Sequence, residues 1–216
     1  MYHTILFDLD GTLTDPGEGI TKSVAYALHK WGIEVKDRTT LYKFIGPPLI
    51  QSFEKFYGFS SEKAMLTTSY FQEYFRDKGI FENEIYPDTQ DLLQKLKASG
   101  KKLMVATSKP EEFAVRVLEY FQIDSYFDVV AGAMMDETRT KKSEVIAYAL
   151  EKAGVTDLSG LVMIGDREHD VIGAKEVGID SIGVLYGYGD RAELEQAGAT
   201  YIAENATEIL SLTMEF

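Results

Sequence analysis

The chain has 216 residues, with 35 acidic and 22 basic side chains, and its formal net charge at pH 7 is −13. Hydrophobic residues make up 45% of the chain and aromatic residues 12%, which is enough for a substantial core in one or two domains and excludes a disordered chain. The excess of negative charge argues against nucleic acids and anionic membranes as partners, because both are polyanions.

Short apolar segments alternate with amphipathic helical patterns along most of the chain. Residues 4–7 form the first expected strand, and they run directly into an acidic turn. Further strands are expected at 102–106, 127–131, 161–164 and 181–184, and helices at 110–121 and 143–153. Strands that alternate with helices in this way form parallel sheets, so the pattern predicts an α/β fold with helices on both faces of the sheet.

Residues 15–85 break this alternation. They show no convincing strand, and a loop at 45–49 separates their helical patterns, which cover 18–31, 39–44, 48–57 and 61–78. We therefore predict a Rossmann-like, doubly wound parallel-sheet core made of residues 1–14 and 86–216. An all-helical domain, residues 15–85, is inserted into it.

Polar residues gather where the expected strands end. The sequence DLDGTLTD (8–15) follows the first strand, TSKP (107–110) follows the second, and GDREHD (165–170) follows a later one. A pair of lysines, 141 and 142, precedes a helix. Because ligands bind beyond the carboxyl ends of strands in doubly wound sheets, we expect these groups to share one rim.

The residue types at this rim suit phosphoryl transfer. The chain has no cysteine and three histidines, so clustered carboxylates would supply oxygen ligands, which Mg²⁺ prefers. An ionised aspartate can attack phosphorus, and a second carboxyl group can move the protons. A threonine and a lysine can hold the phosphoryl oxygens as charge develops.

In this order the four groups resemble the motifs of the haloacid dehalogenase superfamily, and the helical insertion resembles its C1 cap. The resemblance covers essentially the whole chain and is nearest to the phosphoglycolate phosphatase-like branch. It implies that Asp8 is the nucleophile and Asp10 the general acid and base. It also implies that Lys142 screens the nucleophile and the phosphate, with the adjacent Lys141 as the alternative.

The same resemblance implies the remaining ligands. The Mg²⁺ ion would be held by the carboxylates of Asp8 and Asp166 and by the backbone carbonyl of Asp10, with Asp170 behind them orienting water or the lysine. The phosphoryl group would be bound by residues of the first two motifs together with Lys142: Gly11, Thr107 and Ser108. The branch commonly has Thr-Asn where this chain has Thr107-Ser108, which weakens inference about the exact substrate.

Four other features have simpler interpretations. His169 occupies a variable position between two aspartates and is interpreted as a rim histidine. The aromatic residues of 53–59 and 70–81 favour helix packing over a platform for a nucleobase. The loop at 46–49 is either a helix connection or a substrate-facing loop, and Gly187-Tyr188-Gly189 is interpreted as a turn near the rim.

The sequence thus predicts a Mg²⁺-dependent phosphomonoester hydrolase that acts through an aspartyl-phosphate on a small metabolite resembling 2-phosphoglycolate. The first alternative is a 5′-nucleotidase of the same superfamily. A phosphomutase is disfavoured because GDREHD keeps the phosphatase pattern. A phospho-receiver domain would share the acidic cluster, but Asp10 and the long insertion oppose it.

Partners and location follow from absences in the sequence. The start, MYHTILFDLD, lacks a basic segment and a long apolar segment, so it is not a secretory signal. The longest apolar run, 129–135, is too short for a membrane helix. We expect a cytoplasmic monomer or homodimer with no nucleic-acid or membrane partner. Bound Mg²⁺ and Lys142 would make the rim attractive to phosphate despite the net charge.

Overall fold

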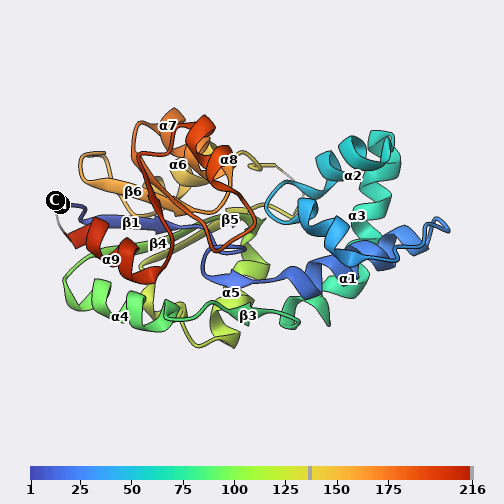
Figure 1. Cartoon of the computed structure of the whole chain (residues 1–216), viewed down its shortest axis with the longest axis horizontal. Coiled ribbons are helices and arrows are strands. Elements are labelled where there is room, and N and C mark those ends of the chain that lie inside the picture. Colours follow the sequence, from blue (N-terminus) through green and yellow to red (C-terminus); the bar gives the residue numbers. More distant parts are fainter. Residues whose placement is uncertain (136–137, 215–216) are drawn as a thin grey trace. The chain divides into compact units, whose positions relative to one another are not determined.

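A computed structural model describes residues 1–135 and 138–214 of the chain. It divides into two compact units, one made of residues 1–14 and 85–216 and the other of residues 15–84 (Figure 1). The chain passes between the units through β2 (Thr14–Asp15) and β3 (Glu84–Ile85), which form a two-stranded sheet of their own.

The first unit is built on a six-stranded sheet with the order β5-β4-β1-β6-β7-β8. All its pairings are parallel, which confirms the predicted α/β class. The chain fills the sheet outward from β1 in one direction and then in the other, so β1 lies at the switch point where such sheets bind ligands. The strands are β1 (Thr4–Phe7), β4 (Lys102–Pro110), β5 (Val129–Ala133), β6 (Leu161–Gly165), β7 (Asp180–Val184) and β8 (Tyr201–Ala203).

Helices cover both faces of this sheet. On one face α6 packs against α7, and on the other α4 packs against α9 (Figure 1). Residues of β1, β4 and β6 that point the same way, Leu6, Met104 and Met163, form a buried cluster with Val145 and Ile146 of α6. The helices are α4 (Thr89–Ala98), α5 (Glu111–Tyr120), α6 (Lys142–Lys152), α7 (Glu168–Val177), α8 (Arg191–Ala197) and α9 (Ala206–Met214), with a short 3₁₀ turn at Asp124–Tyr126.

The second unit consists of α1 (Gly17–His29), α2 (Leu49–Tyr57) and α3 (Ser61–Phe75), with 3₁₀ segments at Arg38–Phe44 and Gly79–Phe81. The segment expected as a helix at 39–44 is thus a 3₁₀ helix. Gly58 takes a left-handed conformation after α2, and the Ser60 hydroxyl accepts a hydrogen bond from the Lys63 N–H at the start of α3. These two residues set the tight turn between the helices.

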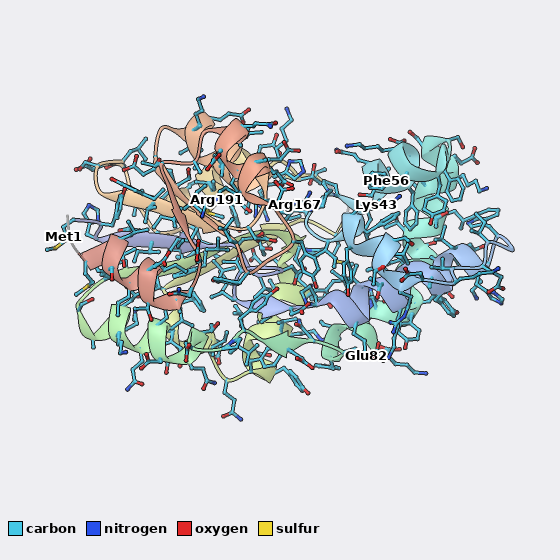
Figure 2. All side chains as sticks on the ribbon, in the orientation of Figure 1. Met1, Lys43, Phe56, Glu82, Arg167 and Arg191 are labelled. Atoms are coloured by element: carbon cyan, nitrogen blue, oxygen red, sulfur yellow. The ribbon has the colours of Figure 1, made fainter. Side chains whose placement is uncertain are left out.

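Aromatic side chains form much of the core of the second unit. Phe44 and Phe53 are 1% and 0% exposed, and their ring centroids are 5.0 Å apart. Phe53 also stacks on Phe59 at 6.2 Å. The ammonium group of Lys43 lies 4.4 Å from the ring centre of Phe56 at the edge of this cluster (Figure 2). These contacts agree with the interpretation of the aromatic segment as helix packing.

None of the helices in the described part of the chain combines the length and the apolar character that a membrane crossing requires.

Candidate active site

The acidic turn after β1 is folded tightly against the end of β6. Gly11 has φ +87°, and its N–H donates to the Thr14 carbonyl at 2.8 Å. A Cβ atom at Gly11 would lie 2.2 Å from a carboxylate oxygen of Asp166. Only glycine combines this backbone conformation with so close an approach, so the glycine of the first motif allows the two strand ends to meet.

Three buried aspartates meet at this edge of the sheet. Asp8 follows β1, Asp166 follows the adjacent β6, and Asp170 lies in the first turn of α7. Each offers a carboxylate oxygen within 4.8 Å of the others. The Arg167 N–H donates to Asp170 Oδ2 at 3.1 Å, which orients that side chain at the start of the helix. The cluster brings Asp8 together with residues 158 and 162 positions later in the chain.

Lys142 joins two of these aspartates. Its Nζ atom lies 3.0 Å from Asp8 Oδ1 and 2.8 Å from Asp170 Oδ1, and it donates to the Ala106 carbonyl at 3.1 Å. Burial opposes its charged form, but Asp170 and Asp8 outweigh burial and raise the pKa of Lys142 above its ordinary value. Lys141, the alternative, is exposed at the start of α6.

Asp10 has a different lysine partner. Its two carboxylate oxygens accept hydrogen bonds from the Lys109 ammonium group at 2.9 and 2.7 Å. Burial raises the pKa of Asp10, and the Lys109 charge counteracts part of that rise. Lys109 was predicted to lie at the rim, with no role. The available signal was its position two residues after Thr107, which places both side chains on one face of a regular strand.

The other predicted phosphate-binding residues lie at the same strand ends. Thr107 is buried at the end of β4, where its Oγ1 accepts a hydrogen bond from the Lys109 N–H at 3.2 Å. Ser108 is half-buried between them. His169 is half-buried on α7 and is not part of the cluster of three aspartates. Burial lowers the pKa of His169, so the neutral imidazole is favoured.

The loop after β7 holds Asp166, a contribution that the sequence analysis did not anticipate. The Tyr188 N–H donates to Asp166 Oδ2 at 2.7 Å, and the Thr12 hydroxyl lies 3.5 Å from Asp166 Oδ1. Cβ atoms at Gly187 and Gly189 would lie 2.4 and 2.0 Å from atoms of Asp166. The Tyr186 hydroxyl donates to the Thr12 carbonyl at 3.0 Å, which ties this loop to the first motif.

The charge balance of the site suits a divalent cation. Four buried carboxylates face two buried lysines, so with all groups ionised the formal charge is −2. Burial raises the pKa of Asp166 well above its ordinary value, and the charges of Asp170 and Asp8 raise it further. A cation beside Asp166 would relieve this cost, and an all-oxygen donor set is the kind that Mg²⁺ takes.

Residues 5–184 match the family of haloacid dehalogenase-like hydrolases. The chain belongs to this family. The predicted membership of the superfamily is therefore confirmed, and members of the family generally use a divalent metal, for which the buried aspartate cluster is suited.

Curated relatives carry several names. A 5′-nucleotidase of Pseudomonas aeruginosa is 44% identical over 93% of this chain and 90% of its own length. The tyrosine-protein kinase PtkA of Mycobacterium tuberculosis is 36% identical over 94% of this chain and 69% of its own. A phosphoglycolate phosphatase of Colwellia psychrerythraea is 28% identical, covering 95% and 94% of the two chains.

Solved structures also resemble this chain. A crystal structure described as a predicted phosphatase from Clostridium acetobutylicum is 46% identical and superposes with a TM-score of 0.97 over 100% of both chains. With the family match, these relatives make the chain an enzyme of the phosphatase type.

Proposed function

We propose that this enzyme hydrolyses the phosphomonoester of a small metabolite through a phosphoaspartate on Asp8, with Mg²⁺ bound at the aspartate cluster. The observation that carries the proposal is the pairing of Asp8 with Lys142 at 3.0 Å while Asp10 is held by a separate lysine. One carboxylate is thereby oriented as a nucleophile, and the other is left for proton transfer.

The proposed first step transfers the phosphoryl group. A carboxylate oxygen of Asp8 forms a bond to phosphorus, and the bond between phosphorus and the ester oxygen breaks. Asp10 in its protonated form gives its proton to the departing oxygen. The phosphoryl oxygens are bound by Lys142, Thr107, Ser108 and the turn at Gly11.

The proposed second step regenerates the enzyme. Water gives a proton to Asp10 and attacks phosphorus, the bond to Asp8 breaks, and inorganic phosphate leaves. Mg²⁺, held by Asp8, Asp166 and the Asp10 carbonyl with Asp170 behind them, would contribute charge neutralisation and orientation when bound. The rigid support of Asp166 by the loop after β7 favours this assignment.

Two substrate classes are candidates, and both are small. The motif pattern favours a phosphoglycolate-like substrate, in agreement with the name of the Colwellia relative. The greater identity to the Pseudomonas relative favours a nucleoside monophosphate. The aromatic residues of the second unit do not favour a nucleotide substrate, because Phe44 and Phe53 are buried and pack between helices.

A substrate panel tests the proposal and ranks the two classes. The purified full-length chain with Mg²⁺ would be assayed for phosphate release from 2-phosphoglycolate and from the 5′-nucleoside monophosphates. We expect kcat/KM for one class to exceed the other by more than about tenfold. An enzyme that releases no phosphate from these compounds or from an aryl phosphate would contradict the proposed activity.

A further inference from the structure

The two buried lysines of the site have separate partners. Lys142 contacts Asp8 and Asp170, whereas the Nζ atom of Lys109 contacts both carboxylate oxygens of Asp10 at 2.9 and 2.7 Å. The side chains of Lys109 and Asp10 are only 4% and 11% exposed. Separating such a pair would leave a buried charge without compensation, so the carboxylate is held firmly in this orientation.

The backbone of β4 places Lys109 for this contact. The pairing of β4 with β5 shifts register between Thr107 and Pro110, as at a β-bulge. The Lys109 N–H turns back to the Thr107 hydroxyl at 3.2 Å. A Cβ atom on the facing Gly132 would lie 2.6 Å from the Lys109 carbonyl oxygen. Irregularities of this kind re-aim a side chain, and here the lysine is directed to the end of β1.

The Asp10 carboxylate also lies outside the neighbouring cluster. The cluster consists of Asp8, Asp166 and Asp170, and the Asp10 carboxylate is not one of its members. Without Lys109, the two side-chain torsions of Asp10 would let the carboxylate turn toward Lys142, the remaining buried cation of the site.

We propose that Lys109 is a positioning residue that holds the Asp10 carboxyl group apart from the Asp8–Asp166–Asp170 cluster, where it faces the leaving-group oxygen. The inference rests on the proposed phosphatase activity and adds a second lysine to its machinery. Lys142 serves the nucleophile, and Lys109 serves the group that moves the proton. Loss of Lys109 should therefore impair departure of the leaving group more than binding of the phosphate.

Two aryl phosphates of similar shape separate these effects. The 4-nitrophenolate ion departs without help, whereas phenolate, whose pKa is close to the value of about 10 for tyrosine, needs a general acid. We expect Lys109→Met to lower kcat/KM for phenyl phosphate at least about tenfold more than for 4-nitrophenyl phosphate. Lys102→Met, at an exposed position of the same strand, is the matched control and should lower neither.

A double-mutant cycle tests whether Lys109 acts through Asp10. In an Asp10→Asn background, Lys109→Met should change kcat/KM for phenyl phosphate by less than about threefold, because the group that it positions is gone. If the factors by which the two single substitutions lower kcat/KM multiply in the double variant, the inference is overturned. Equal losses on the two substrates, or a rise in KM alone, would also overturn it, since they indicate a phosphate-binding or purely structural role.

Failure of this inference is distinct from failure of the proposed function. A wild-type enzyme that hydrolyses neither aryl phosphate would contradict the phosphatase activity itself, whereas an active wild type with equal losses would contradict only the role of Lys109. Folding of each variant would be checked by thermal unfolding. Lys109→Gln removes the charge, keeps an amide that can donate hydrogen bonds and is one bond shorter, and it gives the same comparison should Lys109→Met fail to fold.

Discussion

Two lysines of the α/β unit and two of the helical unit have contrasting surroundings. In the α/β unit, Lys142 and Lys109 are buried and contact carboxylates at 3.0 Å or less. In the helical unit, Lys43 is exposed with its ammonium group 4.4 Å from the centre of the Phe56 ring, and Lys63 lies 3.9 Å from that of Phe59. The first arrangement sets the charge of a reactive site, and the second covers the edge of an aromatic core. Substitutions in the two units should therefore affect different properties.

The largest effect is expected for Lys142→Met. The change leaves Asp8 and Asp170 buried without their shared cation, so we expect kcat/KM for phosphate esters to fall at least about 100-fold. The free energy of unfolding should also decrease by about 3 kcal/mol or more. Both quantities are accessible by steady-state kinetics and urea unfolding.

Lys141→Met is the matched control for that change. Lys141 is the exposed neighbour in sequence, so its loss should change the unfolding free energy by less than about 0.5 kcal/mol and leave turnover close to that of the wild type. The reverse ranking of the two variants would mean that Lys141 is the active-site lysine.

Phe53→Ala tests the helical unit. Phe53 is fully buried between the rings of Phe44 and Phe59, so its truncation leaves a cavity and should lower the free energy of unfolding by about 3–5 kcal/mol. Met65→Ala removes a side chain that is 60% exposed in α3 and should cost less than about 0.5 kcal/mol. Similar losses for both variants would contradict the description of the aromatic core.

Gly187→Ala tests the support of Asp166. The new methyl group would lie 2.4 Å from the Asp166 Cβ atom and 2.3 Å from the Gly11 carbonyl oxygen, so either the carboxylate or the turn must move. We expect Mg²⁺ affinity, measured by calorimetric titration, to fall about 10- to 100-fold. Gly100→Ala is the control for a general loss of stability, because Gly100 has φ +80° and an added Cβ atom would meet nothing within 4 Å beyond the adjacent residues; it should leave Mg²⁺ affinity unchanged.

The smallest effect is expected for Asp128→Asn, away from the site. The Asp128 carboxylate accepts hydrogen bonds from Lys97 at 3.0 Å and from the Leu103 N–H at 2.9 Å. Partial burial opposes its charged form, but these donors outweigh burial and lower the pKa of Asp128. Because the Asp128 side chain is 43% exposed, Asp128→Asn should lower the free energy of unfolding at pH 7 by only about 0.5–1 kcal/mol.

The pH dependence of that loss has a definite sign. A carboxyl group whose pKa is lowered by folding stabilises the folded protein at pH values above the ordinary carboxyl pKa. This stabilisation disappears as the pH falls through the pKa of the group in the folded protein. The difference in unfolding free energy between wild type and Asp128→Asn should therefore shrink as the pH is lowered from 7 toward 3. A difference that stays constant or grows would contradict the assignment. Asp124→Asn, at a nearby exposed position, serves as the reference.

The sequence predicted those parts of the fold that depend on local pattern. The short buried runs that precede Asp8, Thr107 and Asp166 predicted strands, and the structure has a strand at each of these places, although β4 continues past Thr107 to Pro110. The edge strand β8 was missed because it has only three residues, two of them half-buried, which leave no clear pattern.

Other features depend on contacts that local pattern does not reveal. The position of Lys109 two residues beyond Thr107 predicts at most a shared strand face, and its burial follows from the irregularity in β4 and from the neighbouring end of β1. The role of the 186–189 loop depends on its distance from Asp166, 20 or more residues earlier in the chain. The kinds of side chain at the site were thus predictable from the sequence. Which lysine contacts which of the four aspartates could be seen only in the folded structure.

The central claim, that Asp8 is the nucleophile, is tested most directly by trapping the phosphorylated enzyme. The wild type and Asp8→Asn would be mixed with 4-nitrophenyl phosphate and Mg²⁺, quenched within milliseconds, reduced with borohydride and digested for peptide mass spectrometry. The account predicts a modified Asp8 in the wild type, and no modification or turnover in Asp8→Asn. Modification of a different residue, or full turnover by Asp8→Asn, would contradict it.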